Sequence, residues 1–166
     1  MHSSPLSQPS APHIGSILAP RRPPFADPSS ESREREADAD KRTAARILIV
    51  EDDWFAGTDM EAALQDAGYD VPQLVTSADE AVAAADDCEP DLVIMDVRLV
   101  GERDGVDAAL EIARRFGIRS LFVSAFVDPE LRTRAEPARP VGWLAKPISG
   151  EHLVAAVRNA FGRDDE

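Results

Sequence analysis

Ile47-Leu48-Ile49-Val50-Glu51-Asp52-Asp53 is the stretch that decides how this chain of 166 residues folds. Four apolar residues in a row are typical of a central strand in a parallel sheet, where both faces of the strand are covered. Residues 92–95 form a second run of four apolar residues, and this run also ends at an acid, Asp96. The two runs predict two buried strands with carboxylates at their carboxyl ends.

From residue 46 onward, short apolar runs alternate with segments of helical period. The predicted strands span residues 47–50, 71–75, 92–95, 120–123 and 141–144. Apolar residues at helical spacing predict helices within 56–67, 106–116 and 153–161, and the alanine-rich segment 77–86 predicts another. A shorter helix is expected to begin at Pro129 and to be stopped by Pro137, because proline cannot continue a helix. This alternating order predicts an α/β fold with helices on both faces of a parallel sheet.

One proline bears on the order of the strands. Pro72 lies inside the predicted second strand, and proline is tolerated mainly on sheet edges. An edge position for the second strand fits a doubly wound, flavodoxin-like (βα)5 sheet with strand order 2-1-3-4-5. In that order the first and third strands lie side by side.

The first 44 residues differ from the rest in composition. They contain seven of the thirteen prolines and eight serines, and they show neither helical nor strand period. We therefore predict a disordered Pro/Ser-rich arm at 1–44, a folded domain at 45–162 and an acidic tail at 163–166. Because only five residues follow Phe161, we expect no output domain after the folded part.

The net charge of −13 is carried by the residues after the arm, where twelve basic side chains face twenty-five acidic ones. Such a field repels phosphate backbones and argues against nucleic-acid binding. No apolar run approaches the roughly 20 residues of a membrane span, and no signal peptide is evident, so we expect a cytoplasmic protein without membrane contact. Cys88 is the only cysteine and the three histidines are scattered, so a bound metal would need oxygen ligands.

Reactive side chains follow four of the five predicted strands. Glu51 and Asp52 follow the first, Asp96 the third, Ser124 the fourth and Lys146 the fifth. The carboxyl ends of parallel strands meet at one edge of the sheet, so these groups should share a crevice. Crowded carboxylates either rise in pKa or hold a cation, and Mg²⁺ is the natural occupant of a site made of oxygen ligands. A metal, a lysine and a hydroxyl around a carboxylate predict a site that handles a phosphoryl group.

Four stretches together resemble the receiver domain of response regulators in two-component signalling. They are residues 47–53, residues 91–99 with Asp104-Gly105, residues 121–125 and residues 142–147, and the resemblance spans residues 45–161. It implies that Asp96 accepts a phosphoryl group from a histidine kinase or a histidine phosphotransfer protein. Because we expect no output domain, the output would be a contact with an unidentified downstream protein that changes on phosphorylation, or onward passage of the phosphoryl group, rather than an enzymatic activity.

The resemblance also assigns roles to individual residues. Asp52 and Asp96 would bind Mg²⁺ through their carboxylates, Glu51 directly or through water, and Arg98 through its backbone carbonyl. Ser124 would hydrogen-bond one phosphoryl oxygen.

Three further roles follow from the resemblance. Lys146 would pair with another phosphoryl oxygen, Trp143 occupies the position of the aromatic switch residue, and the peptide bond between Lys146 and Pro147 would be cis. Asp53 is expected only to favour the start of the first helix. Asp104-Gly105 is expected to serve as a turn and helix start without a catalytic role.

Three other functions compete with this interpretation. A phosphorylation-independent adaptor would keep the acids but bind its partner regardless of Asp96. A phosphohydrolase with an aspartyl nucleophile is the second alternative. Enzymes of that kind carry a second Asp two residues after the nucleophile, and this chain has Arg98 at that position. A flavodoxin-like electron carrier is disfavoured, because three acids follow the first strand and would repel FMN.

Overall fold

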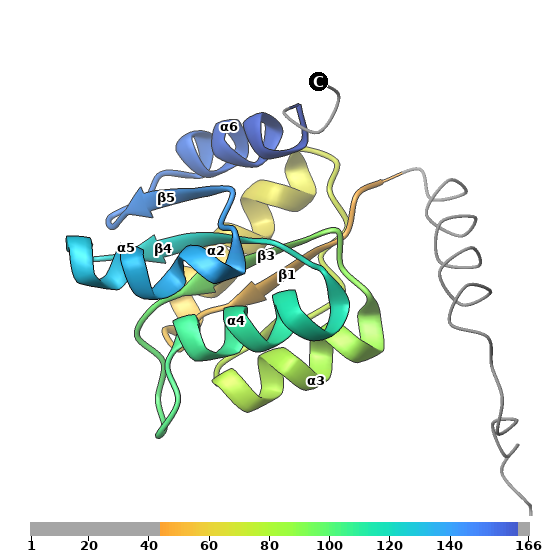
Figure 1. Ribbon diagram of the computed structural model, residues 1–166. Helices are drawn as coiled ribbons and strands as arrows, with labels where there is room; N and C mark the ends of the chain where they lie inside the picture. The colour runs from red at the N-terminus through yellow and green to blue at the C-terminus, as the bar shows by residue number, and fades with distance from the viewer. Residues whose placement is uncertain (1–43, 163–166) are drawn as a thin grey trace, which may run out of the picture. The chain divides into compact units, whose positions relative to one another are not determined.

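The computed structural model describes residues 44–162 (Figure 1). The predicted arm, apart from Ala44, and the predicted tail at 163–166 lie outside the described residues.

Five parallel strands form one sheet. They are β1 (Ile47–Val50), β2 (Leu74–Val75), β3 (Leu92–Asp96), β4 (Ser120–Ser124) and β5 (Gly142–Ala145). Their order is β2-β1-β3-β4-β5, which confirms the predicted flavodoxin-like topology. The residues of β1, β3 and β4 are all buried, as expected of central strands that are covered on both faces.

The second strand is shorter than predicted. Only Leu74 and Val75 pair with β1, so Pro72 lies before the strand and not inside it. The approach to the strand still contacts β1, because the backbone N–H of Ile49 donates to the carbonyl of Gln73 at 3.2 Å. Proline has no N–H to donate, so regular pairing begins only after it. The edge position of the strand is confirmed.

Each helix begins at a side chain that accepts hydrogen bonds from the first turn. The helices are α2 (Trp54–Asp66), α3 (Ala78–Cys88), α4 (Gly105–Phe116), α5 (Pro129–Ala135) and α6 (Gly150–Phe161), and their N-caps are Asp53, Ser77, Asp104, Asp128 and Ser149. Helix α5 ends two residues before Pro137, and the chain continues as the short 3-10 helix η1 (Glu136–Ala138). Glu136 keeps helical backbone angles, but Pro137 has no N–H to donate back along the helix, so the α-helical hydrogen bonding stops there.

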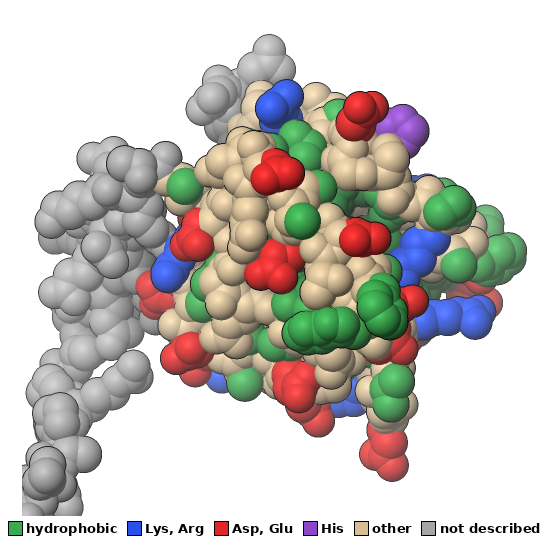
Figure 2. All heavy atoms as spheres, turned by 180° about the vertical axis from the view of Figure 1, so that it is seen from behind, with side chains coloured by type: hydrophobic (Ala, Val, Ile, Leu, Met, Phe, Trp, Pro, Cys, Tyr) green, Lys and Arg blue, Asp and Glu red, His purple; other side chains and the backbone are tan. Residues whose placement is uncertain are grey.

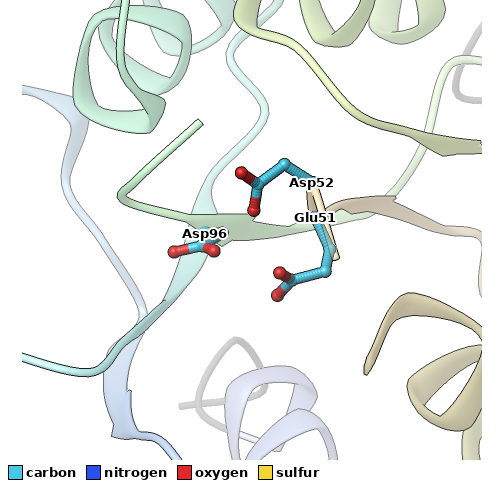
Figure 3. Close-up of side chains that lie close together, drawn as sticks. All are labelled: Glu51, Asp52 and Asp96. Carbon is cyan, nitrogen blue, oxygen red and sulfur yellow. The ribbon is translucent and has the colours of Figure 1, made fainter. Parts of the chain in front are cut away.

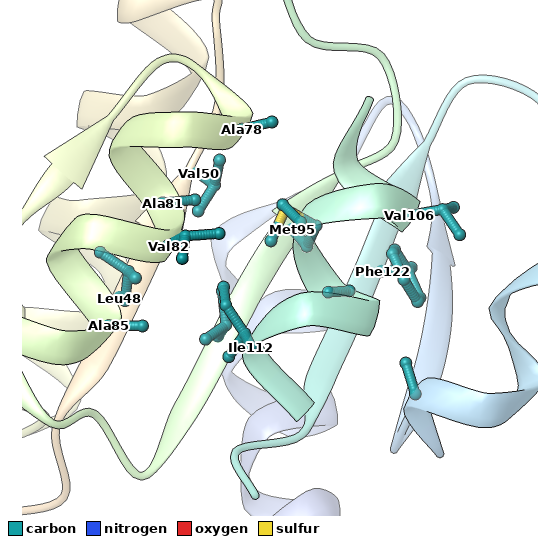
Figure 4. Packing of buried hydrophobic residues seen from close by; sticks show 14 of the residues in the cluster. Leu48, Val50, Ala78, Ala81, Val82, Ala85, Met95, Val106, Ile112 and Phe122 are labelled. Atoms are coloured by element: carbon teal, nitrogen blue, oxygen red, sulfur yellow. The ribbon is translucent and has the colours of Figure 1, made fainter. Parts of the chain in front are cut away.

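The sheet separates two hydrophobic layers. Helices α2 and α6 cover one face, and α3 and α4, joined by α5 and η1, cover the other (Figure 1). Figure 4 shows the second layer, in which Leu48, Met95 and Phe122 of the sheet face Val82 of α3 and Ile112 of α4. Burial on both faces holds the strands rigidly and fixes the positions of the residues at their ends.

The surface of the domain is rich in carboxylates. Figure 2 shows one face of the molecule, on which acidic side chains are scattered and basic ones lie mostly toward the edges. Within residues 44–162, none of the helices is both long enough and apolar enough to cross a bilayer.

Candidate functional site

Three carboxylates meet at the carboxyl ends of β1 and β3. The two strands are in register, with Val50 opposite Met95, so the residues that follow them are neighbours. Glu51, Asp52 and Asp96 each offer an oxygen within 4.8 Å of the others, and Figure 3 shows the three carboxylates grouped at this edge. The predicted meeting of residues more than forty positions apart in sequence therefore takes place.

Lys146 reaches the same place from the end of β5. Its ammonium donates to Oδ2 of Asp96 at 2.7 Å and to Oε1 of Glu51 at 3.0 Å. The lysine is held by its own backbone, because its N–H donates to the carbonyl of Ser124 at 2.9 Å. The peptide bond to Pro147 is cis, as predicted.

Burial sharpens the electrostatics of this group. Glu51 is fully buried and Asp96 is 4% exposed, whereas Asp52 is exposed to solvent. Burial raises the pKa of Glu51, and the neighbouring charge of Asp96 raises it further, against the opposing effect of Lys146. Burial alone would lower the pKa of Lys146, but its bonds to Asp96 and Glu51 outweigh that effect, and the pKa is raised.

The charges around the lysine remain unbalanced. One ammonium stands against three carboxylates, so an excess of negative charge stays at a partly buried site. Oε2 of Glu51 lies 2.8 Å from the Lys146 nitrogen, yet it is buried without a well-aligned hydrogen bond. A set of oxygen ligands, one of them without a hydrogen bond, fits a hard divalent cation. Glu51, Asp52 and Asp96 could therefore hold a metal ion.

Asp53 plays a separate part from the two acids before it. Its carboxylate accepts from the backbone N–H groups of Phe55 and Ala56, at 3.0 and 3.2 Å, and so caps α2. Its own backbone N–H donates to Glu51 at 3.2 Å. Asp53 thus supports the start of the helix and the orientation of Glu51.

The loop after Asp96 is held close to its carboxylate. The backbone N–H of Arg98 donates to Oδ1 of Asp96 at 3.0 Å, and the N–H of Gly105 donates to the carbonyl of Val97 at 2.9 Å. A Cβ on Gly105 would lie 1.8 Å from the carbonyl oxygen of Asp96, so only glycine fits. Sequence reasoning treated Gly105 as a turn residue and missed this contact. No signal in a single sequence reveals it.

Ser124 and Trp143 contact residues outside the acidic group. The Ser124 hydroxyl donates to the carbonyl of Phe126 at 2.7 Å and accepts from its N–H at 3.2 Å, so it is engaged with the loop after β4. The half-buried ring of Trp143 stacks on Phe122, with 4.5 Å between centroids, and the guanidinium of Arg132 lies 5.2 Å from the Trp143 ring. The phosphoryl contact of Ser124 and the switch role of Trp143 stay predictions.

The sequence and this geometry agree with one family of known proteins. Residues 47–158 match the model of the response regulator receiver domain. The chain belongs to this family. Receiver domains serve two-component signalling.

Several regulatory proteins contain a segment that is similar to this chain. The transcriptional regulatory protein PdtaR of Mycobacterium tuberculosis is 37% identical over 126 residues, which cover 76% of this chain and 61% of PdtaR. The phyllosphere-induced regulator PhyR of Methylorubrum extorquens is 30% identical over 128 residues, 76% of this chain and 46% of PhyR. The receiver thus spans less than two thirds of the length of these curated relatives.

A solved structure shares the fold. The signal receiver domain of a modulated diguanylate cyclase from Desulfovibrio desulfuricans G20 superimposes with a TM-score of 0.68 at 32% identity. The match covers 74% of this chain and 97% of that domain.

Proposed function

We propose that this receiver accepts a phosphoryl group on Asp96, in a Mg²⁺-dependent reaction, from a histidine kinase or a histidine phosphotransfer protein. The observation that carries the proposal is the buried Asp96 carboxylate, which shares the ammonium of Lys146 with Glu51. A structural ion pair needs one acid for one base. Two acids share one lysine here, and Asp52 lies beside them. This arrangement suits a site in which a bound metal ion supplies further positive charge.

The transfer follows from these groups. A carboxylate oxygen of Asp96 attacks the phosphorus, the P–N bond of the phosphohistidine breaks, and the imidazole leaves with the electron pair. Lys146 would then pair with a phosphoryl oxygen and balance its charge. When bound, Mg²⁺ would neutralise charge on the transferring group, held by Glu51, Asp52 and Asp96 and by the backbone carbonyl of Arg98.

Ser124 would connect the reaction to the rest of the protein. Its hydroxyl bonds to the backbone of Phe126. A bond to a phosphoryl oxygen would draw the hydroxyl inward and release Phe126, with consequences for the loop that leads into α5. The changed surface would control contact with a downstream protein, or the phosphoryl group would pass onward.

Paired substitutions test the proposal. Full-length protein is incubated with acetyl phosphate and Mg²⁺, and the adduct is followed by intact mass. Asp96→Asn should abolish the adduct. Asp53→Asn is the matched control, because asparagine preserves the helix cap, and it should leave the adduct intact. Equal labelling of the wild type and Asp96→Asn would refute the assignment, and binding of a partner that ignores Asp96→Asn would favour the adaptor.

A further inference from the structure

Helix α5 carries two arginines that reach in different directions. Arg134 pairs through Nη2 with Oδ1 of Asp104, and it lies 3.4 Å from Oδ1 of Asp107. Arg132 lies over the ring of Trp143 on β5. One seven-residue helix therefore contacts both the start of α4 and the aromatic residue of β5.

Arg134 contacts the start of α4, which in turn packs against Asp96. Asp104 and Asp107 form the capping box that starts α4, with Asp104 accepting from the N–H of Val106 and of Asp107 at 3.0 Å each. The next residue, Gly105, packs against the backbone carbonyl of Asp96. Arg134 thus holds the cap of the helix whose first residue touches Asp96.

The contact of Arg132 leads to the sheet. Trp143 stacks on Phe122 of β4, and the guanidinium of Arg132 lies on the same indole ring. A cation over an aromatic face is attracted by the ring quadrupole, so this contact favours conformations in which Arg132 stays on the Trp143 ring.

Helix α5 is also joined to the site through the chain. The loop before it contains Phe126, whose backbone is held by Ser124. The helix itself is short and has one fully buried residue, Ala135. Besides these few core contacts, the helix is held by the Arg134 ion pair, by the Arg132 contact with Trp143 and by the hydrogen bonds of Ser124 to the preceding loop. This arrangement favours a helix that shifts as a unit.

We propose that the two arginines of α5 couple the Asp96 loop to Trp143, so that α5 transmits the state of the site to β5. Arg134 and Arg132 are then positioning residues, not catalytic ones. The inference rests on the proposed function, because the state that α5 transmits is phosphorylation of Asp96. An exposed ion pair contributes little to stability, so a purely structural role of Arg134 would have little effect on folding and none on Trp143.

The first test uses the full-length chain with Trp54→Phe, which leaves Trp143 as its only tryptophan. Acetyl phosphate and Mg²⁺ are added, phosphoryl occupancy is read by intact mass, and Trp143 emission is read in the same sample. Arg134→Gln and Arg132→Gln should reduce the emission change per phosphoryl group by about threefold. Arg134→Lys should recover part of it, because lysine keeps the charge but not the forked donor.

Arg115→Gln is the matched control. The side chain of Arg115 is 43% exposed and pairs with Glu111 at 3.0 Å, while that of Arg134 is 44% exposed. Arg115→Gln should retain the full emission change. The inference would be overturned if Arg134→Gln showed the same emission change per phosphoryl group as the parent. It would also be overturned if Trp143 emission in the fully phosphorylated parent did not change.

A second test needs no phosphorylation. Asp104→Asn keeps a capping side chain but weakens the pair with Arg134, so it should shift Trp143 emission in the Trp54→Phe parent. The same substitution should have no effect once Arg132→Gln is present, and the cycle of four proteins isolates this coupling. An equal shift with and without Arg132 would overturn the inference. Failure to form any adduct would instead refute the proposed function, and this cycle would still decide the coupling.

Discussion

Gly105 packs against the backbone of Asp96 so closely that a methyl group on Gly105 would lie 1.8 Å from the Asp96 carbonyl oxygen. The start of α4 and the end of β3 are therefore built as one unit. Gly105→Ala must displace that backbone, and we expect it to lower the free energy of unfolding by about 3 kcal/mol, the upper range for overpacking. Urea unfolding measures the loss, and phosphorylation should slow in the same variant.

Gly162→Ala provides the control for this substitution. Gly162 has helical backbone angles, and the nearest atom to an added Cβ would be the Arg158 carbonyl oxygen at 3.4 Å. We expect a stability change within about 0.5 kcal/mol, typical of surface substitutions. Equal effects of the two alanines would show that the close approach at Asp96 is not limiting.

Lys146→Met tests the shared ammonium. Removal of the lysine leaves Glu51 and Asp96 facing each other without a counter-charge, so we expect a loss of about 3 kcal/mol at neutral pH. Arg158→Met, which removes an exposed cation from α6, should cost far less. Comparable losses in the two variants, measured by chemical unfolding, would contradict the central position of Lys146.

The raised pKa of Glu51 predicts a pH dependence of known sign. The folded protein holds the Glu51 proton more tightly than the unfolded chain, whose ordinary value is 4.5. As the pH rises above 4.5, the unfolded chain loses this proton first, so the wild type loses stability relative to Glu51→Gln. The advantage of Glu51→Gln should grow through that window and then level off. Unfolding free energies of both proteins at a series of pH values measure it.

Glu80→Gln should behave in the opposite way. The backbone N–H of Thr76 donates to Glu80 at 3.0 Å, and this bond is the main cause that lowers the pKa of Glu80 below its ordinary value of 4.5. The wild type should therefore hold its advantage over Glu80→Gln above pH 4.5 and lose it as the pH falls through the lowered value. The same sign for both glutamates would contradict the account of burial at Glu51.

Mg²⁺ should stabilise the folded domain through its acidic group. At ten times the dissociation constant, binding adds about 1.4 kcal/mol to the free energy of unfolding. Asp52→Asn should remove most of this gain, whereas Asp59→Asn, which neutralises an exposed acid on α2, should preserve it. Thermal unfolding with and without MgCl₂ makes the comparison. An equal gain in both variants would point to nonspecific screening.

Most of the fold could be predicted because the apolar runs of the central strands are unambiguous. All-apolar strands, βα alternation and a proline placed inside the predicted second strand were enough for the topology, and topology alone brought Glu51 and Asp96 together. The length of β2 was wrong, because Pro72 lacks an N–H and regular pairing starts after it.

Contacts set by tertiary placement could not be predicted. The sequence identified Gly105 as a helix start, but its contact with Asp96 depends on how α4 meets β3. Arg132 and Arg134 look like ordinary surface residues of a short helix. Only the position of α5 beside α4 and β5 puts one of them on Trp143 and the other on the cap of α4.

The central claim, that Asp96 accepts the phosphoryl group, is tested most directly by chemical trapping. Full-length protein is incubated with acetyl phosphate in the presence or absence of Mg²⁺ and then treated with sodium borohydride, which reduces an aspartyl phosphate to homoserine. Peptide mass spectrometry locates the change. We predict homoserine at position 96 alone and only when Mg²⁺ is present. Homoserine at position 52 or 53, or an adduct that forms equally without Mg²⁺, would contradict the account.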